Sequence, residues 1–145
     1  MKWVTRAHVH VDRVACPWLI SRFVYSGAKF VFVATYIVDQ FGQDEVATPF
    51  DIEGAELGHQ DGHCSFVSIM NKYHLTDKAL LQLADVVNAA DTDQLDANPY
   101  ARGLEALAQG FSLMYTDDTD NLEAQFAVYY ALYAFFRLKV ASENA

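Results

Sequence analysis

The sequence contains two cysteines, few basic residues and no long apolar run, and each shortage excludes a class of protein. Two cysteines are too few for the disulfide framework of a small secreted fold. Without a Cys-x-x-Cys pair or a His-Glu-x-x-His motif, a structural zinc knot is disfavoured. Ten basic against nineteen acidic residues give a net charge of -9. Since nucleic-acid binding depends on Lys and Arg neutralising phosphates, we expect no nucleic-acid partner.

The chain also lacks a segment that could enter a membrane or direct secretion. Its longest apolar run ends at Phe136 and is about half as long as a bilayer-spanning helix. The N-terminus carries Lys2, Arg6 and His8 where a signal peptide would be apolar. We therefore expect no membrane partner and a cytoplasmic location, in which the cysteines stay reduced.

What the sequence does contain predicts a folded domain. Hydrophobic residues make up 52% of the chain and charged residues 20%, far from the composition of disordered proteins. A chain of 145 residues is long enough to bury a substantial core, so we expect a single domain over residues 1–145. The first thirty residues hold five basic side chains and one acidic one, which leaves the acidic surplus to the rest of the chain.

Hydrophobic periodicity predicts a β-α-β unit near the N-terminus. Apolar and polar residues alternate over 3–11, as in a strand. Pro17 suits a first helical turn, and Ser26-Gly27 would end that helix. The apolar run 30–33 predicts a second strand, and 46–50 predicts another strand before a glycine-rich loop over 54–62.

Helices should occupy the remainder, over 65–73, 76–90, 99–114 and 120–140, the last one opened by a capping box from Asp120 to Glu123. The predicted fold class is therefore α+β, with a small N-terminal β-α-β sheet packed against a mainly helical C-terminal half. The last helix is apolar nearly all round, which indicates burial in the core or a homodimer interface through this aromatic helix.

A first polar constellation follows the opening strand. Arg6, His8 and His10 share one face of the expected strand, and Asp12, Arg13 and Cys16 come at its C-terminal end. This face is either an ordinary solvated surface or an anion site. In the second case the ligand-binding residues would be Arg6, Asp12, Arg13 and Arg22.

A second constellation packs carboxylates, imidazoles and a thiol into residues 51–64. Two interpretations are open. Either the glycines form turns and Cys64 enters the core, or the loop binds a metal. In the metal interpretation His59 binds the ion with partners from His8, Glu56 and Asp91. Asp91 ends a predicted helix, where a carboxylate opposes the helix dipole and favours a compensating cation if it is not solvated. Carboxylates beside imidazole favour iron, manganese or zinc.

Five segments of the sequence resemble one known family. They are Lys2–Phe23, Ala47–Ile52, Glu56–His59, Cys64–Phe66 and Ala90–Asp91. They are similar to the chromate resistance family, the ChrB C-terminal domain, and the resemblance extends over almost the whole chain. The resemblance implies a bacterial cytoplasmic component of chromate resistance. His59 and Cys64 fit the family pattern and His63 does not.

Longer members of this family add an N-terminal region linked to regulation, and related chains carry a rhodanese-like sulfurtransferase domain. Because the shared motif starts at Lys2, we expect no such companion domain here. Three functions then compete. The first is a module that binds an oxyanion, chromate or a related anion, a transition metal, or both. The second is a metal-dependent redox or sulfur-transfer enzyme in which Cys16 or Cys64 acts as the catalytic thiol. The third is a helical self-association or partner-interaction module.

Overall fold

The computed structural model describes residues 1–144 and has the expected α+β architecture. Its sheet has three parallel strands in the order β2-β1-β3, with bounds Lys29–Val33, Lys2–Arg6 and Ala47–Pro49. The α-helices are α1 (Val11–Leu19), α2 (Val38–Asp44), α3 (Ser65–Lys72), α4 (Lys78–Asp91), α5 (Ala101–Met114) and α6 (Asp118–Glu143). Short 3-10 turns cover Thr35–Ile37 and Leu95–Ala97. Among residues 1–144, none of the helices combines the length and apolarity that crossing a bilayer requires.

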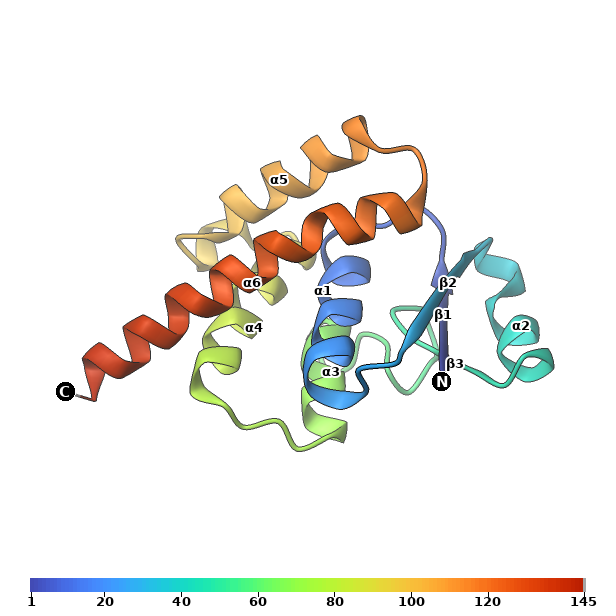
Figure 1. Ribbon diagram of the computed structural model, residues 1–145, viewed down its shortest axis with the longest axis horizontal. Coiled ribbons are helices and arrows are strands. Elements are labelled where there is room, and N and C mark those ends of the chain that lie inside the picture. The colour runs from blue at the N-terminus through green and yellow to red at the C-terminus, as the bar shows by residue number, and fades with distance from the viewer. Residues whose placement is uncertain (145) are drawn as a thin grey trace.

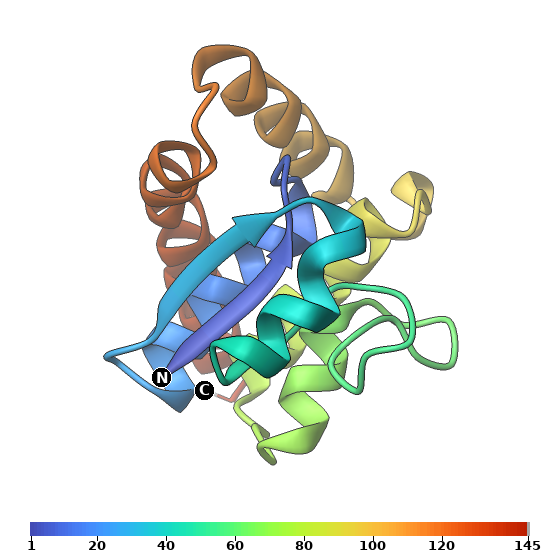
Figure 2. The same ribbon diagram turned by 90° about the vertical axis from the view of Figure 1, so that its right-hand side faces the viewer.

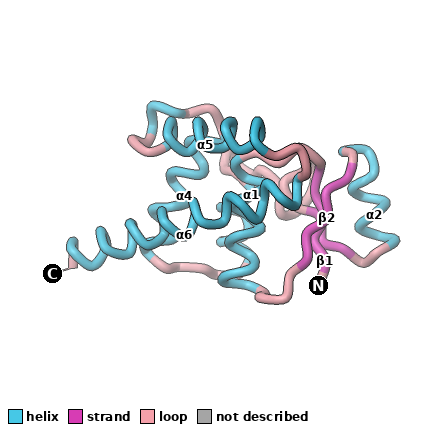
Figure 3. The backbone as a smooth tube through the Cα atoms, turned by 45° about the horizontal axis from the view of Figure 1, so that its top comes forward, coloured by secondary structure: helices cyan, strands magenta, loops and turns pink. Residues whose placement is uncertain are grey.

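The sheet lies between two layers of helices (Figures 1 and 3). On one face α2 packs over a small cluster of Val4, Val38 and Ala47. Figure 2 shows α2 in front of the strands, with α5 and α6 on the far side. The opposite face carries the main core, where Trp3 and Trp18 are fully buried. The expected β-α-β opening is confirmed because β1 and β2 pair in parallel with α1 between them.

The first strand is shorter than the alternating pattern predicts. It ends at Arg6, so the extension to Val11 is wrong. His8 has a left-handed backbone with φ 67°, and the N–H groups of His8 and Val9 donate to the Asp118 carboxylate at 3.0 and 2.9 Å. This long-range contact turns the chain from β1 directly into α1.

Helix α1 begins at Val11 rather than near Pro17, which lies inside it. Proline has no N–H and disturbs the hydrogen bonding of the preceding turn. A π-helical segment, Ile20–Val24, follows, and the Tyr25 N–H donates to the Ile20 carbonyl at 2.8 Å. The early start matters because it places Asp12 in the first turn of α1.

The helices of the second half follow their expected positions closely. The N-cap of α4 is Asp77, whose carboxylate accepts from the N–H groups of Ala79 and Leu80. Helix α6 starts at Asp118 with Asp117 as its cap, so the capping box from Asp120 is wrong. Trp18 anchors α1 against α6, with its ring centroid 5.7 Å from that of Tyr130 and 5.8 Å from that of Phe23 in the π-helical segment.

Candidate metal centre

The candidate site lies where the carboxyl ends of the three parallel strands meet. Arg6 ends β1, Thr35 follows β2 after one intervening residue, and Asp51 comes two residues after β3. In open sheets with parallel strands, ligands bind outside these ends, because the chain leaves each strand there and the connecting loops diverge. Helices α1 and α3 begin beside the same edge, and each contributes to the site.

One imidazole and three carboxylates converge there. His59 Nε2 lies 2.9 Å from Asp91 Oδ2, 3.3 Å from Asp51 Oδ1 and 3.7 Å from Asp12 Oδ2. One ligand atom from each of these four side chains lies within 4.8 Å of all the others. The donors come from α1, the turn after β3, the loop before α3 and the end of α4, so only the folded chain brings them together.

Asp12 is the most deeply placed carboxylate, with 1% of its surface exposed. Its oxygens accept from the backbone N–H groups of Ser65 at 2.6 Å and Phe66 at 3.1 Å. These donors are free because they lie in the first turn of α3, where a carboxylate also complements the helix dipole. Burial, together with the charges of Asp51 and Asp91, raises the pKa of Asp12 well above its usual value.

Asp51 sits on a turn with φ 47° and is 2% exposed. It accepts from the Ser65 hydroxyl at 3.0 Å, and the Arg13 and Arg6 guanidinium groups lie 3.2 and 3.7 Å from its second oxygen. Burial raises its pKa, but contact with His59 and the two arginines outweighs burial and holds the pKa below its usual value. Asp51 is therefore the carboxylate most readily ionised in the site.

Asp91 is the last residue of α4, where its negative charge opposes the helix dipole. Its contacts explain how the fold accommodates this unfavourable charge. Its carboxylate accepts from the Asp12 backbone N–H at 3.3 Å and contacts the His59 imidazole. Burial and the neighbouring charge of Asp51 raise its pKa. His59, whose pKa these carboxylates raise, supplies the cationic compensation expected near this helix end.

His59 itself is partly open to solvent, with 46% of its side chain exposed. Contact with Asp51, together with the charges of Asp12 and Asp91, raises its pKa to about 9 despite partial burial. The preceding Gly58 fixes the loop, because a Cβ there would lie 2.5 Å from the Ile52 carbonyl oxygen. Only glycine lets the backbone pass close enough to aim His59 at the carboxylates.

An open cavity of about 270 Å³ adjoins this group. Its lining includes Arg6, Thr35, Asp51, Gly54 and His59. The Arg6 side chain is 44% exposed, so part of its guanidinium faces the cavity rather than Asp51. A ligand entering here would meet the exposed side of His59 and a cationic group together.

Several residues expected in the site lie elsewhere. His8 is exposed beyond the end of β1 and only its backbone is engaged. Glu56 pairs with Lys72 at 3.2 Å on the surface. Arg22 lies in the π-helical segment with its guanidinium 5.2 Å from the centre of the Phe23 ring. Arg13 does reach the site, where it joins Asp51 to the His8 carbonyl oxygen at 2.6 Å.

The two cysteines are fully buried beside Asp12. The Cys16 thiol donates to Asp12 Oδ1 at 3.3 Å, and Cys64 precedes the Ser65 N–H that binds the same carboxylate. Burial, followed by the charge of Asp12, raises the pKa of both thiols well above the usual value. Both are therefore neutral thiols at neutral pH, packed behind the carboxylates rather than exposed to the cavity.

Sequence reasoning counted Asp51 among the polar residues of its loop but did not select it as a ligand. Its position directly after a strand at the sheet edge was the available signal. Asp12 was selected for anion binding, whereas in the structure it faces His59 and two other carboxylates. Ser65, which binds both Asp12 and Asp51, carried no such signal because its role depends on the approach of α3 to α1.

Comparison with known proteins places the chain in a family. Residues 3–136 match the family model described as ChrB, C-terminal domain. The chain is also 33% identical over 138 residues to Protein ChrB of Cupriavidus metallidurans, covering 93% of this chain and 40% of that relative. No solved structure matches it. With a family match over nearly its whole length, the chain belongs to the ChrB C-terminal domain family, the chromate resistance family that its sequence resembles.

Proposed function

We propose that the protein binds one divalent transition metal between His59, Asp12, Asp51 and Asp91, and that the bound metal and Arg6 together hold a small oxyanion. The observation that carries this proposal is the convergence of four ligand atoms within 4.8 Å. Three oxygen donors and one imidazole suit Mn²⁺ or Fe²⁺, ahead of Zn²⁺, and disfavour copper(I).

Electrostatics support a cation in this position. Burial, followed by the repulsion among three neighbouring carboxylates, raises the pKa of Asp12 and of Asp91. A divalent ion would remove that repulsion and would replace the His59 proton, which occupies the centre of the group in the metal-free protein. Hydrogen bonds from Ser65, Phe66 and Arg13 already orient two of the carboxylates, as outer partners do in metal sites.

The adjoining cavity supports an oxyanion as the second ligand. An anion there would lie beside the bound cation and accept charge-assisted hydrogen bonds from Arg6. Arg13 is committed to Asp51 and the His8 carbonyl, so it acts by holding Asp51. Membership of a chromate resistance family favours chromate or a related tetrahedral anion as the partner.

The enzymatic alternative has less support. A redox or sulfur-transfer reaction through Cys16 or Cys64 needs an accessible thiolate, and both side chains are buried with raised pKa values. The cytoplasmic location remains a prediction from the sequence.

Isothermal titration calorimetry with Mn²⁺ on chelator-treated, tag-free protein tests the metal. We expect one ion per chain and an affinity at least about tenfold weaker for His59→Ala, because loss of a ligand exceeds the usual effect of an outer partner. His63→Ala is the matched control, since His63 is exposed in the same loop outside the group, and it should bind as the parent does. Equal binding by the parent and His59→Ala, or no binding by the parent, would overturn the proposal.

A second titration, of chromate and of sulfate into the Mn²⁺-loaded parent, tests the anion separately. We expect binding that weakens in Arg6→Gln and disappears when the metal is removed. Arg22→Gln serves as the control because Arg22 lies away from the cavity. Anion affinity that is unchanged in Arg6→Gln would remove the oxyanion part and leave the metal part standing.

A further inference from the structure

Helix α6 presents an unpartnered apolar face to solvent. Its inner face packs on α1, α4 and α5 through buried residues such as Tyr129 and Phe136. The opposite side exposes Leu138, which is 69% accessible, and its margin carries Tyr130, which is 47% accessible and also packs one edge on Trp18 of α1. Six of its exposed positions recur at intervals of three and four along the helix, which places these six on one side. They are Ala127, Tyr130, Ala131, Ala134, Leu138 and Ala141, the outer face of α6.

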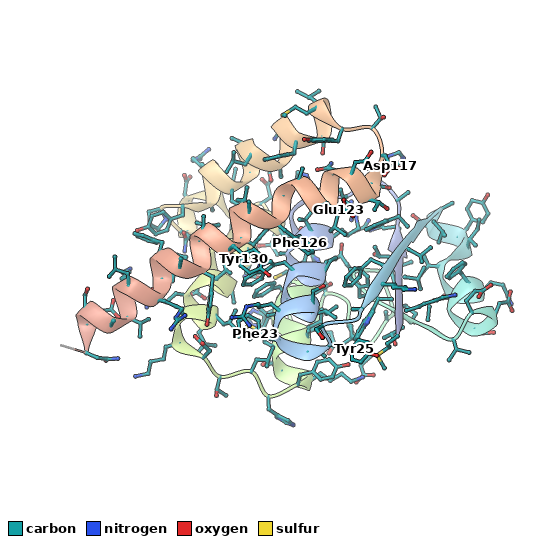
Figure 4. All side chains as sticks on the ribbon, viewed as in Figure 1. Phe23, Tyr25, Asp117, Glu123, Phe126 and Tyr130 are labelled. Carbon is teal, nitrogen blue, oxygen red and sulfur yellow. The ribbon has the colours of Figure 1, made fainter. Side chains whose placement is uncertain are left out.

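The outer face is long and unobstructed. Helix α6 has 26 residues and is therefore about 39 Å long. Figure 1 shows it lying across the front of α1 and α4, with its C-terminal end extending past the rest of the fold. Figure 4 shows Glu123 and Tyr130 along this helix, with Asp117 at its start.

The outer face has an acidic residue near one end and a basic residue near the other. These two charges would pair if a second helix of the same sequence lay antiparallel to the first. Glu123 flanks the face near its N-terminal end, and Arg137 flanks the same side near its C-terminal end. Both are exposed, and neither makes an ion pair with another residue in 1–144. The Arg137 guanidinium lies 5.9 Å from the centre of the Tyr133 ring, and the side chain lines a cavity together with Asp77 and Lys78.

We propose that the outer face of α6 binds the same face of a second copy of this chain, with the two helices antiparallel. A two-fold axis near Tyr130 and Ala131 would set Ala127 opposite Ala134 of the second copy. Glu123 would then lie beside Arg137 of the second copy, and symmetry repeats this pair at the other end. The small alanine side chains allow the two helices to approach closely, while Tyr130 and Leu138 supply most of the apolar area.

Self-pairing accounts for this pattern better than an unrelated partner does. In a two-fold interface, a residue i of one copy that contacts residue j of the other implies the reverse contact, of residue j in the first copy with residue i in the second. The face satisfies this requirement with one acidic and one basic residue placed at nearly equal distances from its centre. A partner of a different sequence would not require that symmetry. The proposal is independent of the metal, since none of the four candidate ligands lies on α6.

Sedimentation velocity of the full chain over a range of concentrations tests the dimer. We expect the parent to be a dimer and Ala134→Glu to be a monomer with the same circular dichroism spectrum. Position 134 is exposed in the single chain, so glutamate there should not disturb the fold. A parent that stays monomeric throughout, or an Ala134→Glu variant that dimerises like the parent, overturns the proposal.

Charge exchange tests the antiparallel register. Glu123→Arg and Arg137→Glu should each weaken dimerisation by at least about tenfold, since each brings like charges together, and the double variant should restore it. The matched controls are Lys139→Glu and Glu143→Arg, which make the same changes of charge on the exposed sides of α6 away from the outer face. Failure of the double variant to recover would overturn the antiparallel pairing.

Discussion

The imidazole of His59 lies 2.9 Å from the carboxylate of Asp91, although one residue belongs to a loop and the other ends α4. A carboxylate at that end of a helix opposes the helix dipole, and this one is also largely withdrawn from solvent. The arrangement is stable in the metal-free protein because a protonated imidazole supplies the compensating charge. In the function proposed above, a metal ion would take the place of this proton.

The first prediction concerns the pH dependence of the metal-free protein. The pKa of His59 is raised from 6.5 to about 9 by folding. The protonated imidazole therefore stabilises the folded state fully below about pH 6.5, and this contribution is lost as the pH rises through 9. Urea unfolding across this interval should show a decline in the free energy of unfolding of the parent that is absent in His59→Gln. A parallel decline in both proteins would contradict the assignment.

The second prediction concerns Asp12. Replacement by alanine leaves the buried N–H groups of Ser65 and Phe66 without their acceptor, at a cost of about 2 kcal/mol in the free energy of unfolding. Asp12→Asn keeps one carbonyl oxygen and should lose less. Urea titrations of both variants at neutral pH measure the difference. Equal losses would show that the carboxylate does not hold the start of α3.

The third prediction concerns Gly58. Alanine at this position would bring its Cβ against the Ile52 carbonyl and displace the loop that carries His59. Gly58→Ala should therefore weaken Mn²⁺ binding measurably. Gly103→Ala is the control, because nothing lies within 4 Å of its added Cβ in α5 and alanine there should stabilise the helix by up to about 1 kcal/mol. Metal affinity equal to that of the parent in Gly58→Ala would contradict the role given to the loop.

The fourth prediction concerns the thiols. Cys16 and Cys64 are buried and protonated, so the native protein should react slowly with iodoacetamide at neutral pH. Mass spectrometry should find both cysteines modified rapidly only after unfolding in urea. Rapid modification of either thiol in the native protein would restore the case for a catalytic cysteine.

Local sequence patterns predicted the elements that local interactions determine. Helices α4 and α5 lie where apolar residues recur at helical spacing. The parallel pairing of β1 and β2 follows from the β-α-β order. The end of β1 was mispredicted because the carboxylate of Asp118, far along the chain, accepts hydrogen bonds from the N–H groups of His8 and Val9. No pattern within the first strand carries that information.

The candidate site was predictable in part for a similar reason. His59 and Asp91 were selected from the glycine-rich loop and from an unfavourable helix end, and the structure brings them together. His8 was placed with them as a residue of the first strand and Glu56 as an acidic residue of the same loop, but a left-handed turn directs His8 elsewhere and Glu56 pairs with Lys72 on the surface. Asp51 depends on a turn with φ 47°, which non-glycine residues seldom adopt and which sequence periodicity does not reveal.

A crystal grown with Mn²⁺, measured for anomalous scattering at the manganese edge, tests the central claim most directly. We predict one strong anomalous peak within bonding distance of His59 Nε2 and of carboxylate oxygens from Asp12, Asp51 and Asp91. A peak at other residues, or no peak in a crystal whose mother liquor contains the ion in excess, would contradict the metal site and the oxyanion function that depends on it.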